Sequence, residues 1–357
     1  MTVLTLPGLI DCHVHLREPG ALHKEDFSTG TAAALAGGIT TVLGMPNTSP
    51  PLVDSASLAL AEKAAHLRAR CDYGLYVAAT SENAGTISTL ADRAVGLKFY
   101  LDSTFGPLLI EGISVLREHM SRRAPELPLV FHAEGRTLAI VLLCAYLENC
   151  AVHIAHVSRR EEIELIRDAK QRGIKVTCEV CPHHLFLSTQ DIPRLGAGWC
   201  EVRPMLASPD DSAALWQNME FVDCIATDHA PHTIAEKSGT NPPPGFPGLE
   251  TVVALMLTAI HEGRFTVEGL IERMHDNPRR IFNLPEQPNT LIEVDTEENW
   301  TVRGSEMQSR AGWSPFEGST VRGRVKRVVL RDKLAYENGV VLAEPGSGHN
   351  VKAKTIS

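Results

Sequence analysis

The stretch Gly8-Leu9-Ile10-Asp11-Cys12-His13-Val14-His15 decides how the chain folds. It begins as a short apolar run, which predicts a strand, and it closes that strand with two histidines. Side chains alternate along a strand, so His13 and His15 point to the same face. Two imidazoles on one face are half of a metal site, although an isolated pair of this kind more often shares a strand by chance. The rest of the chain therefore has to supply the other ligands.

Short apolar runs recur along the chain and alternate with longer helix-like segments. The strand candidates are residues 8–10, 39–43, 73–78, 95–101, 127–131, 152–155, 175–180 and 221–226, and the helix candidates include 55–69, 110–119, 137–148 and 160–172. This alternation predicts an α/β fold whose parallel sheet closes into a TIM-like (β/α)8 barrel. A doubly wound open sheet is the alternative, but no G-x-G-x-x-G follows the first strand.

The pattern changes after residue 282. Residues 290–341 alternate as strands with Gly and Pro turns, and residues 2–6 alternate in the same way. We expect a hydrolase barrel over 8–285, with a small β subdomain and C-terminal extension formed by 1–7 and 286–357. The proline-rich patch 241–248 cannot be helical and predicts a stiff loop near a site.

Composition and charge narrow the class of protein. The chain has 357 residues, 43% hydrophobic and 22% charged, which is the balance of a soluble enzyme with one large core. A net charge of -9 without a long Lys/Arg run argues against nucleic acid or membrane as a partner. No apolar membrane stretch or signal peptide is visible, so we expect a cytoplasmic protein whose eight dispersed cysteines are reduced thiols.

Further polar residues follow the later strands. Lys98 lies in the fourth strand, His132 ends the fifth, and His156 and Asp228 follow the sixth and eighth. The carboxyl ends of barrel strands meet at one face, so these residues predict one pocket whose ligands suit zinc. Two ions sharing a bridging hydroxide would supply a nucleophile, and Asp228 would act as general base and then general acid. A role for Asp228 as a ligand alone is the alternative.

Lys98 is flanked by apolar residues, so burial should depress its pKa. A neutral amine can capture carbon dioxide, and the oxygens of the resulting carbamate could bridge two metal ions. The alternative is a lysine that extends to solvent or forms a salt bridge.

Two stretches resemble the signatures of the dihydroorotases, a family of cyclic amidohydrolases. Residues 11–20 (DCHVHLREPG) resemble the first signature, and residues 226–232 (ATDHAPH) followed by Lys237 resemble the second. Residues 44–48, 132–134 and 242–251 resemble the dihydroorotase domain of the animal-type multifunctional pyrimidine-synthesis polyprotein. The resemblance runs essentially end to end.

The resemblance implies reversible, zinc-dependent cyclisation of N-carbamoyl-L-aspartate to L-dihydroorotate plus water in de novo pyrimidine synthesis. It implies a binuclear centre in which Lys98 is an N6-carboxylysine. One zinc falls to His13, His15, Lys98 and Asp228, and the other to Lys98, His132 and His156. The substrate-binding positions implied are Arg17, Asn47, Arg203, His232 and the backbone near Pro244. Arginine suits this substrate because its guanidinium binds carboxylates with two parallel hydrogen bonds.

The same resemblance bears on a lid and on a third metal. Thr104 and Phe105 match a Thr-Phe pair on a loop that closes over substrate in the animal domain. Animal domains of this type can hold a third zinc with a cysteine and a glutamate, which correspond here to Ala155 and Glu179. Because Ala155 replaces the cysteine and so removes its thiolate, we predict a weak third site and two tightly bound zinc ions. Cys178-x-x-Cys181 is not counted as a zinc motif, because a strand would place its sulfurs on opposite faces.

The resemblance also implies a homodimer, with carbamoyl phosphate synthetase and aspartate transcarbamoylase domains as covalent neighbours. The alternative is a free enzyme that is not part of a longer polypeptide. One rival is a dihydropyrimidinase-like or allantoinase-like enzyme, against which Arg17, Asn47 and His232 argue because they suit a carboxylate. The other rival is an inactive scaffold, against which the complete set of predicted ligands argues.

Overall fold

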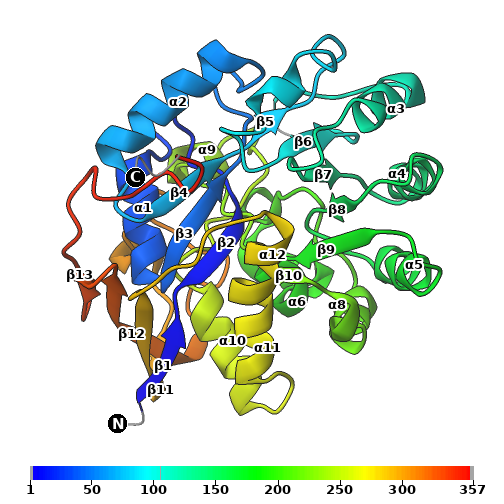
Figure 1. Ribbon diagram of the computed structural model, residues 1–357. Coiled ribbons are helices and arrows are strands. Elements are labelled where there is room, and N and C mark those ends of the chain that lie inside the picture. The colour runs from blue at the N-terminus through cyan, green and yellow to red at the C-terminus, as the bar shows by residue number, and fades with distance from the viewer. Residues whose placement is uncertain (1–2, 105, 354–357) are drawn as a thin grey trace.

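The computed structural model describes residues 3–104 and 106–353. It contains a barrel of parallel strands ringed by helices, which confirms the predicted (β/α)8 fold (Figure 1). The barrel strands, in chain order, are β2 (Leu9–Val14), β3 (Ile39–Gly44), β4 (Asp72–Leu75) with β5 (Val77–Ala78), β6 (Leu97–Tyr100), β7 (Leu129–His132), β8 (Val152–Ile154), β9 (Val176–Val180) and β10 (Cys224–Ile225).

The helices lie on the outside of the barrel, and the four helix candidates agree with α2 to α5 to within three residues at each end. The α-helices are α1 (Phe27–Ala36), α2 (Ser55–Arg68), α3 (Ile113–Ser121), α4 (Arg136–Leu147), α5 (Arg160–Gln171), α6 (Pro182–Phe186), α7 (Ile192–Leu195), α8 (Pro209–Gln217), α9 (Ile234–Lys237), α10 (Val252–His261), α11 (Val267–Ile271) and α12 (Asn277–Ile281). Within the described ranges, none of them combines the length and apolar character that a membrane crossing requires.

One expected strand, 73–78, is interrupted at Tyr76. β4 pairs with β3, whereas β5 pairs with β6, and the bonds from Val95 N to Leu75 O and from Val77 N to Gly96 O continue the barrel across the interruption. The C-terminal tail pairs with β4 at Tyr73: Tyr73 N donates to His349 O at 2.9 Å, and Val351 N donates to Tyr73 O at 2.9 Å. Buried backbone groups need partners, and here a segment from the far end of the chain supplies them.

The gap between β10 and β2 is closed by side chains as well as by backbone. His15 N donates to His229 O at 2.7 Å. Asp11, which is fully buried, accepts from Thr227 Oγ1 at 2.5 Å and from His13 N at 3.1 Å. This junction holds the carboxyl ends of the first and last barrel strands together.

Both termini build the antiparallel sheet beside the barrel (Figure 1). Its strands, in spatial order, are β1 (Val3–Pro7), β11 (Leu291–Thr301), β12 (Thr320–Leu330), β13 (Lys333–Glu337) and β14 (Val340–Val341). β1 pairs with β11 over its whole length, from Val3 opposite Asp295 to Pro7 opposite Leu291. The small β addition predicted from the two ends of the chain is therefore present.

Candidate metal centre and substrate pocket

The first predicted ligands, His13 and His15, reach the carboxylate of Asp228. β2 ends at Val14, so both histidines lie at the carboxyl end of the strand. His13 Nε2 and His15 Nε2 lie 3.3 Å and 3.0 Å from the same oxygen, Asp228 Oδ1. One donor atom from each of the three buried side chains lies within 4.8 Å of the others. This arrangement fits a divalent metal ion.

The other predicted ligands lie on neighbouring strands at the same end of the barrel. Lys98 is in β6, His132 ends β7, and His156 follows β8 closely. His132 Nδ1 lies 2.9 Å from His156 Nε2. The ring centroids of His156 and His13 are 5.1 Å apart, so the two groups of ligands adjoin.

Lys98 is buried completely, and its Nζ has no hydrogen-bond partner in the described part of the chain. Burial lowers the pKa of Lys98 to about 8, against the opposing charges of Glu179 and Asp228. A buried amine without a partner is costly unless another group satisfies it. A carbamate on Nζ, shared by two metal ions, would remove that cost.

The electrostatics of the centre suit metal ligands. Burial alone would raise the pKa of the Asp228 carboxyl, but the charge of His13 and the hydrogen bond from His15 outweigh burial and hold the pKa below its usual range. Burial lowers the pKa of His15 to about 4, although Asp228 opposes the shift. A neutral imidazole and an ionised carboxylate are the forms in which these groups bind metals.

Three of the predicted site residues have left-handed backbone conformations. The φ angles of Arg17, His156 and Asp228 are 60°, 37° and 46°. Non-glycine residues rarely adopt such angles, and those that do cluster at functional sites where surrounding structure holds the strain. These turns aim the three side chains into the pocket where each strand ends.

Glu179 on β9 is fully buried and lies behind His13. Its Oε1 contacts His13 Nδ1, so the carboxylate orients this imidazole and leaves Nε2 to face Asp228. Ala155, the position corresponding to the animal-type cysteine, carries no donor atom.

The predicted carboxylate-binding residues surround His232. Arg17 Nη2 lies 3.0 Å from His232 Nε2, and that nitrogen lies 2.9 Å from Pro244 O. Lys24 Nζ lies 3.1 Å from His232 Nδ1. Burial, followed by the charges of Arg17 and Lys24, holds the pKa of His232 far below its usual range, so the imidazole is neutral. Lys24 is also paired with Glu236 Oε1 at 2.9 Å, so most of the positive charge that this group offers to a carboxylate comes from Arg17.

The other predicted substrate positions differ in what they contact. Asn47 Oδ1 lies 2.7 Å from His15 Nδ1, so Asn47 orients a metal-ligand candidate, a role that the sequence did not indicate. Arg203 Nη1 pairs with Glu201 Oε2 at 3.1 Å and donates to Val202 O. The polar contacts described for Arg203 do not join it to the other predicted residues.

The lid candidates lie on the loop after β6. Thr104 is described, whereas Phe105 lies outside the described residues. A Cβ built on Gly106 would lie 3.9 Å from Asn47 Cβ, which places this loop against the pocket.

Three residues of the pocket were not predicted from the sequence. Lys24 is buried beside His232. Tyr100 has a buried Oη with no hydrogen-bond partner among the described residues, and its ring centroid lies 6.3 Å from that of His132. His183 follows β9, and burial lowers its pKa to about 4. The alternation that pairs Tyr100 with Lys98 on one strand face could have revealed Tyr100.

Comparison with known proteins identifies the family. The model of the amidohydrolase family matches residues 4–272. The chain is 54% identical over 353 residues to the multifunctional protein pyr1-3 of Dictyostelium discoideum, and it spans 16% of that protein's length. It is 33% identical over 366 residues to a dihydroorotase of Pyrococcus furiosus, covering 97% of this chain and 85% of the relative.

Solved structures agree on the fold. An L-hydantoinase (dihydropyrimidinase) from Arthrobacter aurescens superposes with a TM-score of 0.93 at 26% identity, covering 98% of this chain and 88% of that one. An inactive dihydroorotase-like domain of a Chaetomium thermophilum CAD-like multifunctional protein gives a TM-score of 0.85 at 30% identity, covering 98% and 99%. The match to the family model and the near full-length match to the Pyrococcus relative show that the chain belongs to the amidohydrolase family and, within it, to the dihydroorotases.

Proposed function

We propose that this chain catalyses the reversible cyclisation of N-carbamoyl-L-aspartate to L-dihydroorotate and water, a step of pyrimidine synthesis. The observation that carries the proposal is that two sites adjoin each other. A complete set of metal-ligand candidates lies at the carboxyl ends of the barrel strands, and a cationic pocket for a carboxylate adjoins it at Arg17. The substrate needs both, because one ring amide reacts while a carboxylate anchors the ring.

Two zinc ions fit the residues present. His13, His15, Asp228 and a carboxylated Lys98 would hold one, and His132, His156 and the same Lys98 would hold the other. When bound, the metals polarise the amide carbonyl and make water acidic enough to attack it at neutral pH. The buried Nζ of Lys98 has no hydrogen-bond partner among the described residues, which supports the role of a carboxylated Lys98 as a ligand shared by both metal ions. Native mass spectrometry should detect one added carbon dioxide per chain. A metal-loaded protein without that added mass would contradict it.

Asp228 is the group that we assign to proton transfer. In ring opening its carboxylate takes a proton from the attacking water and then delivers it to the departing ring nitrogen. Its contacts with two imidazoles hold its pKa low and keep it ionised, which is the form that can accept a proton. Ring closure runs the same transfers in reverse.

We assign binding of the substrate carboxylate to Arg17, His232 and Asn47. The carbonyl oxygen of Pro244 holds His232 in place. Lys24 adds positive charge on the far side of the imidazole. Arg203 would have to exchange its pairing with Glu201 for the substrate carboxylate. Thr104 and Phe105 are proposed as the lid that excludes water.

The decisive variant is Asp228→Asn. Asparagine tolerates positive φ, so the change removes the proton acceptor while keeping the backbone turn. We expect kcat for dihydroorotate hydrolysis to fall by about 100-fold or more, with the fold preserved by circular dichroism. Asp168→Asn, at an exposed carboxylate on α5, is the matched control. Activity that survives Asp228→Asn would refute the assigned role.

A catalytically inactive scaffold is the second candidate, favoured by the similarity to the inactive Chaetomium domain. The ligand candidates His13, His15, Lys98, His132, His156 and Asp228 are all present here, which favours activity. Zinc analysis separates the readings, since a scaffold of this kind would purify without bound metal.

We also propose which domains neighbour this chain and how it assembles. The chain covers 16% of the length of each of two multifunctional relatives, which supports further domains as covalent neighbours. We propose that these neighbours are carbamoyl phosphate synthetase and aspartate transcarbamoylase domains, and that the chain forms a homodimer, which sedimentation equilibrium can test. All eight cysteines are free thiols, which is compatible with the reducing cytoplasm. A third ion held by Glu179 in the animal manner would be weak, because Ala155 offers no ligand.

A further inference from the structure

A second group of ligand atoms lies deeper in the barrel, below the centre described above. Cys12 on β2, His153 on β8 and Cys224 on β10 place one donor atom each within 4.8 Å of one another. All three side chains are at most 1% exposed. Two sulfurs and an imidazole nitrogen are preferred ligands of structural zinc.

The carboxylate of Glu179 lies next to two members of this group. Its Oε2 lies 3.3 Å from Cys12 Sγ and 3.2 Å from His153 Nε2. Its other oxygen, Oε1, is the one that contacts His13. One carboxylate thus faces both groups, with a different oxygen turned to each.

The imidazole of His153 is oriented to act as a ligand. Its Nδ1 lies 2.8 Å from Thr177 Oγ1, which is also within hydrogen-bond distance of Val152 O. Without metal, the ring can donate from Nε2 to Glu179 Oε2 and accept from the Thr177 hydroxyl at Nδ1. With a metal ion on Nε2, the proton would move to Nδ1 and Thr177 Oγ1 would accept it, which keeps the ring in place.

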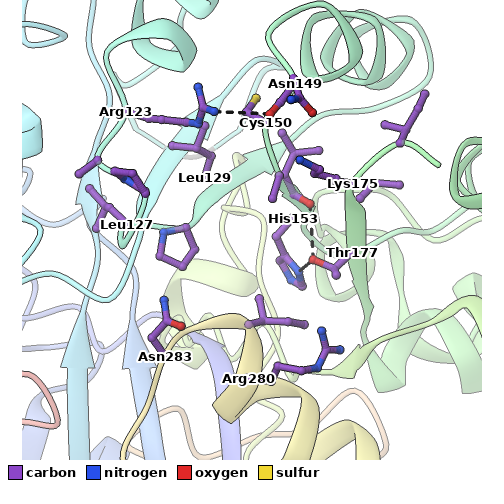
Figure 2. A pocket seen from close by; sticks show the side chains of 18 of the residues that line it. Arg123, Leu127, Leu129, Asn149, Cys150, His153, Lys175, Thr177, Arg280 and Asn283 are labelled. Atoms are coloured by element: carbon purple, nitrogen blue, oxygen red, sulfur yellow. Dashed lines mark hydrogen bonds between the residues drawn. The ribbon is translucent and has the colours of Figure 1, made fainter.

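A cavity lies beside His153 at the opposite end of the barrel from the substrate pocket. It has a volume of about 600 Å³ and opens at the amino ends of β7, β8 and β9, and His153 and Thr177 are among its lining residues (Figure 2). Figure 2 shows the imidazole of His153 and its bond to Thr177 at this cavity. Of the three members of the group, His153 is therefore the one that lies nearest to this cavity.

We propose that Cys12, His153 and Cys224 form a structural zinc site of their own, with the carboxylate of Glu179 beside it. Its thiolates come from the first and last barrel strands, so the ion ties together the strands whose ends carry His13 and Asp228. It does not use position 155, which is alanine. The site is independent of the proposed activity.

X-ray absorption at the zinc edge of the unmodified protein, purified under reducing conditions, tests the proposal without any mutation. We expect sulfur scatterers at about 2.3 Å beside nitrogen and oxygen. A spectrum of fully metal-loaded protein with nitrogen and oxygen scatterers alone would overturn the site. Dihydroorotate hydrolysis by the same sample would then survive, so failure of this site is distinguishable from failure of the proposed function.

Cobalt substitution assigns the sulfurs to residues. The cobalt-loaded protein should show a near-ultraviolet thiolate-to-cobalt band, which weakens in Cys12→Val and vanishes in the double variant with Cys224→Ala. Metal content should fall from about three to about two ions per chain in the double variant. Cys71→Ala, at a buried cysteine outside the group, should keep both. An unchanged band in a folded double variant would contradict the assignment.

Discussion

At the scale of single residues, strand alternation carries most of the predictive power. His13 and His15 share a face because they are two positions apart at the end of a strand, while His132 ends one strand and Asp228 follows another, and the carboxyl ends of these strands meet. Such periodicity is local, so the sequence displays it. The left-handed turn at Asp228 and the approach of Lys24 to His232 depend on contacts between distant segments, which periodicity does not encode.

Arg17 is expected to act on binding more than on chemistry. Arg17→Gln removes the charge that faces the substrate carboxylate, and a hydrogen bond to a charged group is worth about 1.5 to 3 kcal/mol. KM for dihydroorotate should therefore rise by about 10- to 150-fold, while kcat changes less. Steady-state kinetics check this, with Arg172→Gln at an exposed arginine as the control. An unchanged KM would remove Arg17 from the pocket.

At the scale of elements, the strand and helix candidates match the structure except where tertiary contacts intervene. The expected strand 73–78 divides at Tyr76, whose Oη donates to Cys12 O at 2.8 Å across the barrel. The division lets the C-terminal tail pair with β4, and nothing local in the sequence signals that pairing. The segment 304–313 before β12 is likewise held by distant groups, among them Glu250.

Glu250 makes stability depend on pH. Its oxygens accept from Gln308 N at 2.9 Å and Ser309 N at 3.0 Å, and burial raises its pKa from 4.5 to about 7. Between these values the folded state keeps a proton that the unfolded state has lost, so the free energy of unfolding falls as pH rises through this window. The fall should be on the order of 3 kcal/mol.

Glu250→Gln should abolish that part of the pH dependence, because glutamine does not titrate. Urea unfolding at pH 5 and pH 8 measures it. Glu286→Gln, at a side chain 85% exposed, should leave the profile as in the wild type. A Glu250→Gln profile as steep as that of the wild type would show that another group is responsible.

At the scale of the whole molecule, the barrel and the appended sheet were both predictable from the change of pattern along the chain. The closure of the barrel was not, since it depends on Asp11 bonding across to Thr227. That junction lies directly beneath the metal-ligand candidates on β2 and β10. Metal binding and global stability should therefore be coupled.

Removal of metal should lower the melting temperature. An ion that binds only the folded state adds about 4 kcal/mol when present at 1,000 times its Kd, which corresponds to a shift of about 5 °C for a chain of this length. Differential scanning calorimetry before and after chelation measures the shift, and excess zinc should reverse it. A melting temperature that chelation leaves unchanged would argue against metal bound in the barrel.

The central claim is that the carboxylate pocket makes this amidohydrolase a dihydroorotase. The most direct measurement compares kcat/KM of the zinc-loaded protein for L-dihydroorotate and for dihydrouracil, the same ring without the carboxylate. We predict a preference for dihydroorotate of about 100-fold or more, since dihydrouracil leaves Arg17 without its partner. Equal turnover, or a preference for dihydrouracil, would contradict the claim and place the chain with the dihydropyrimidinases.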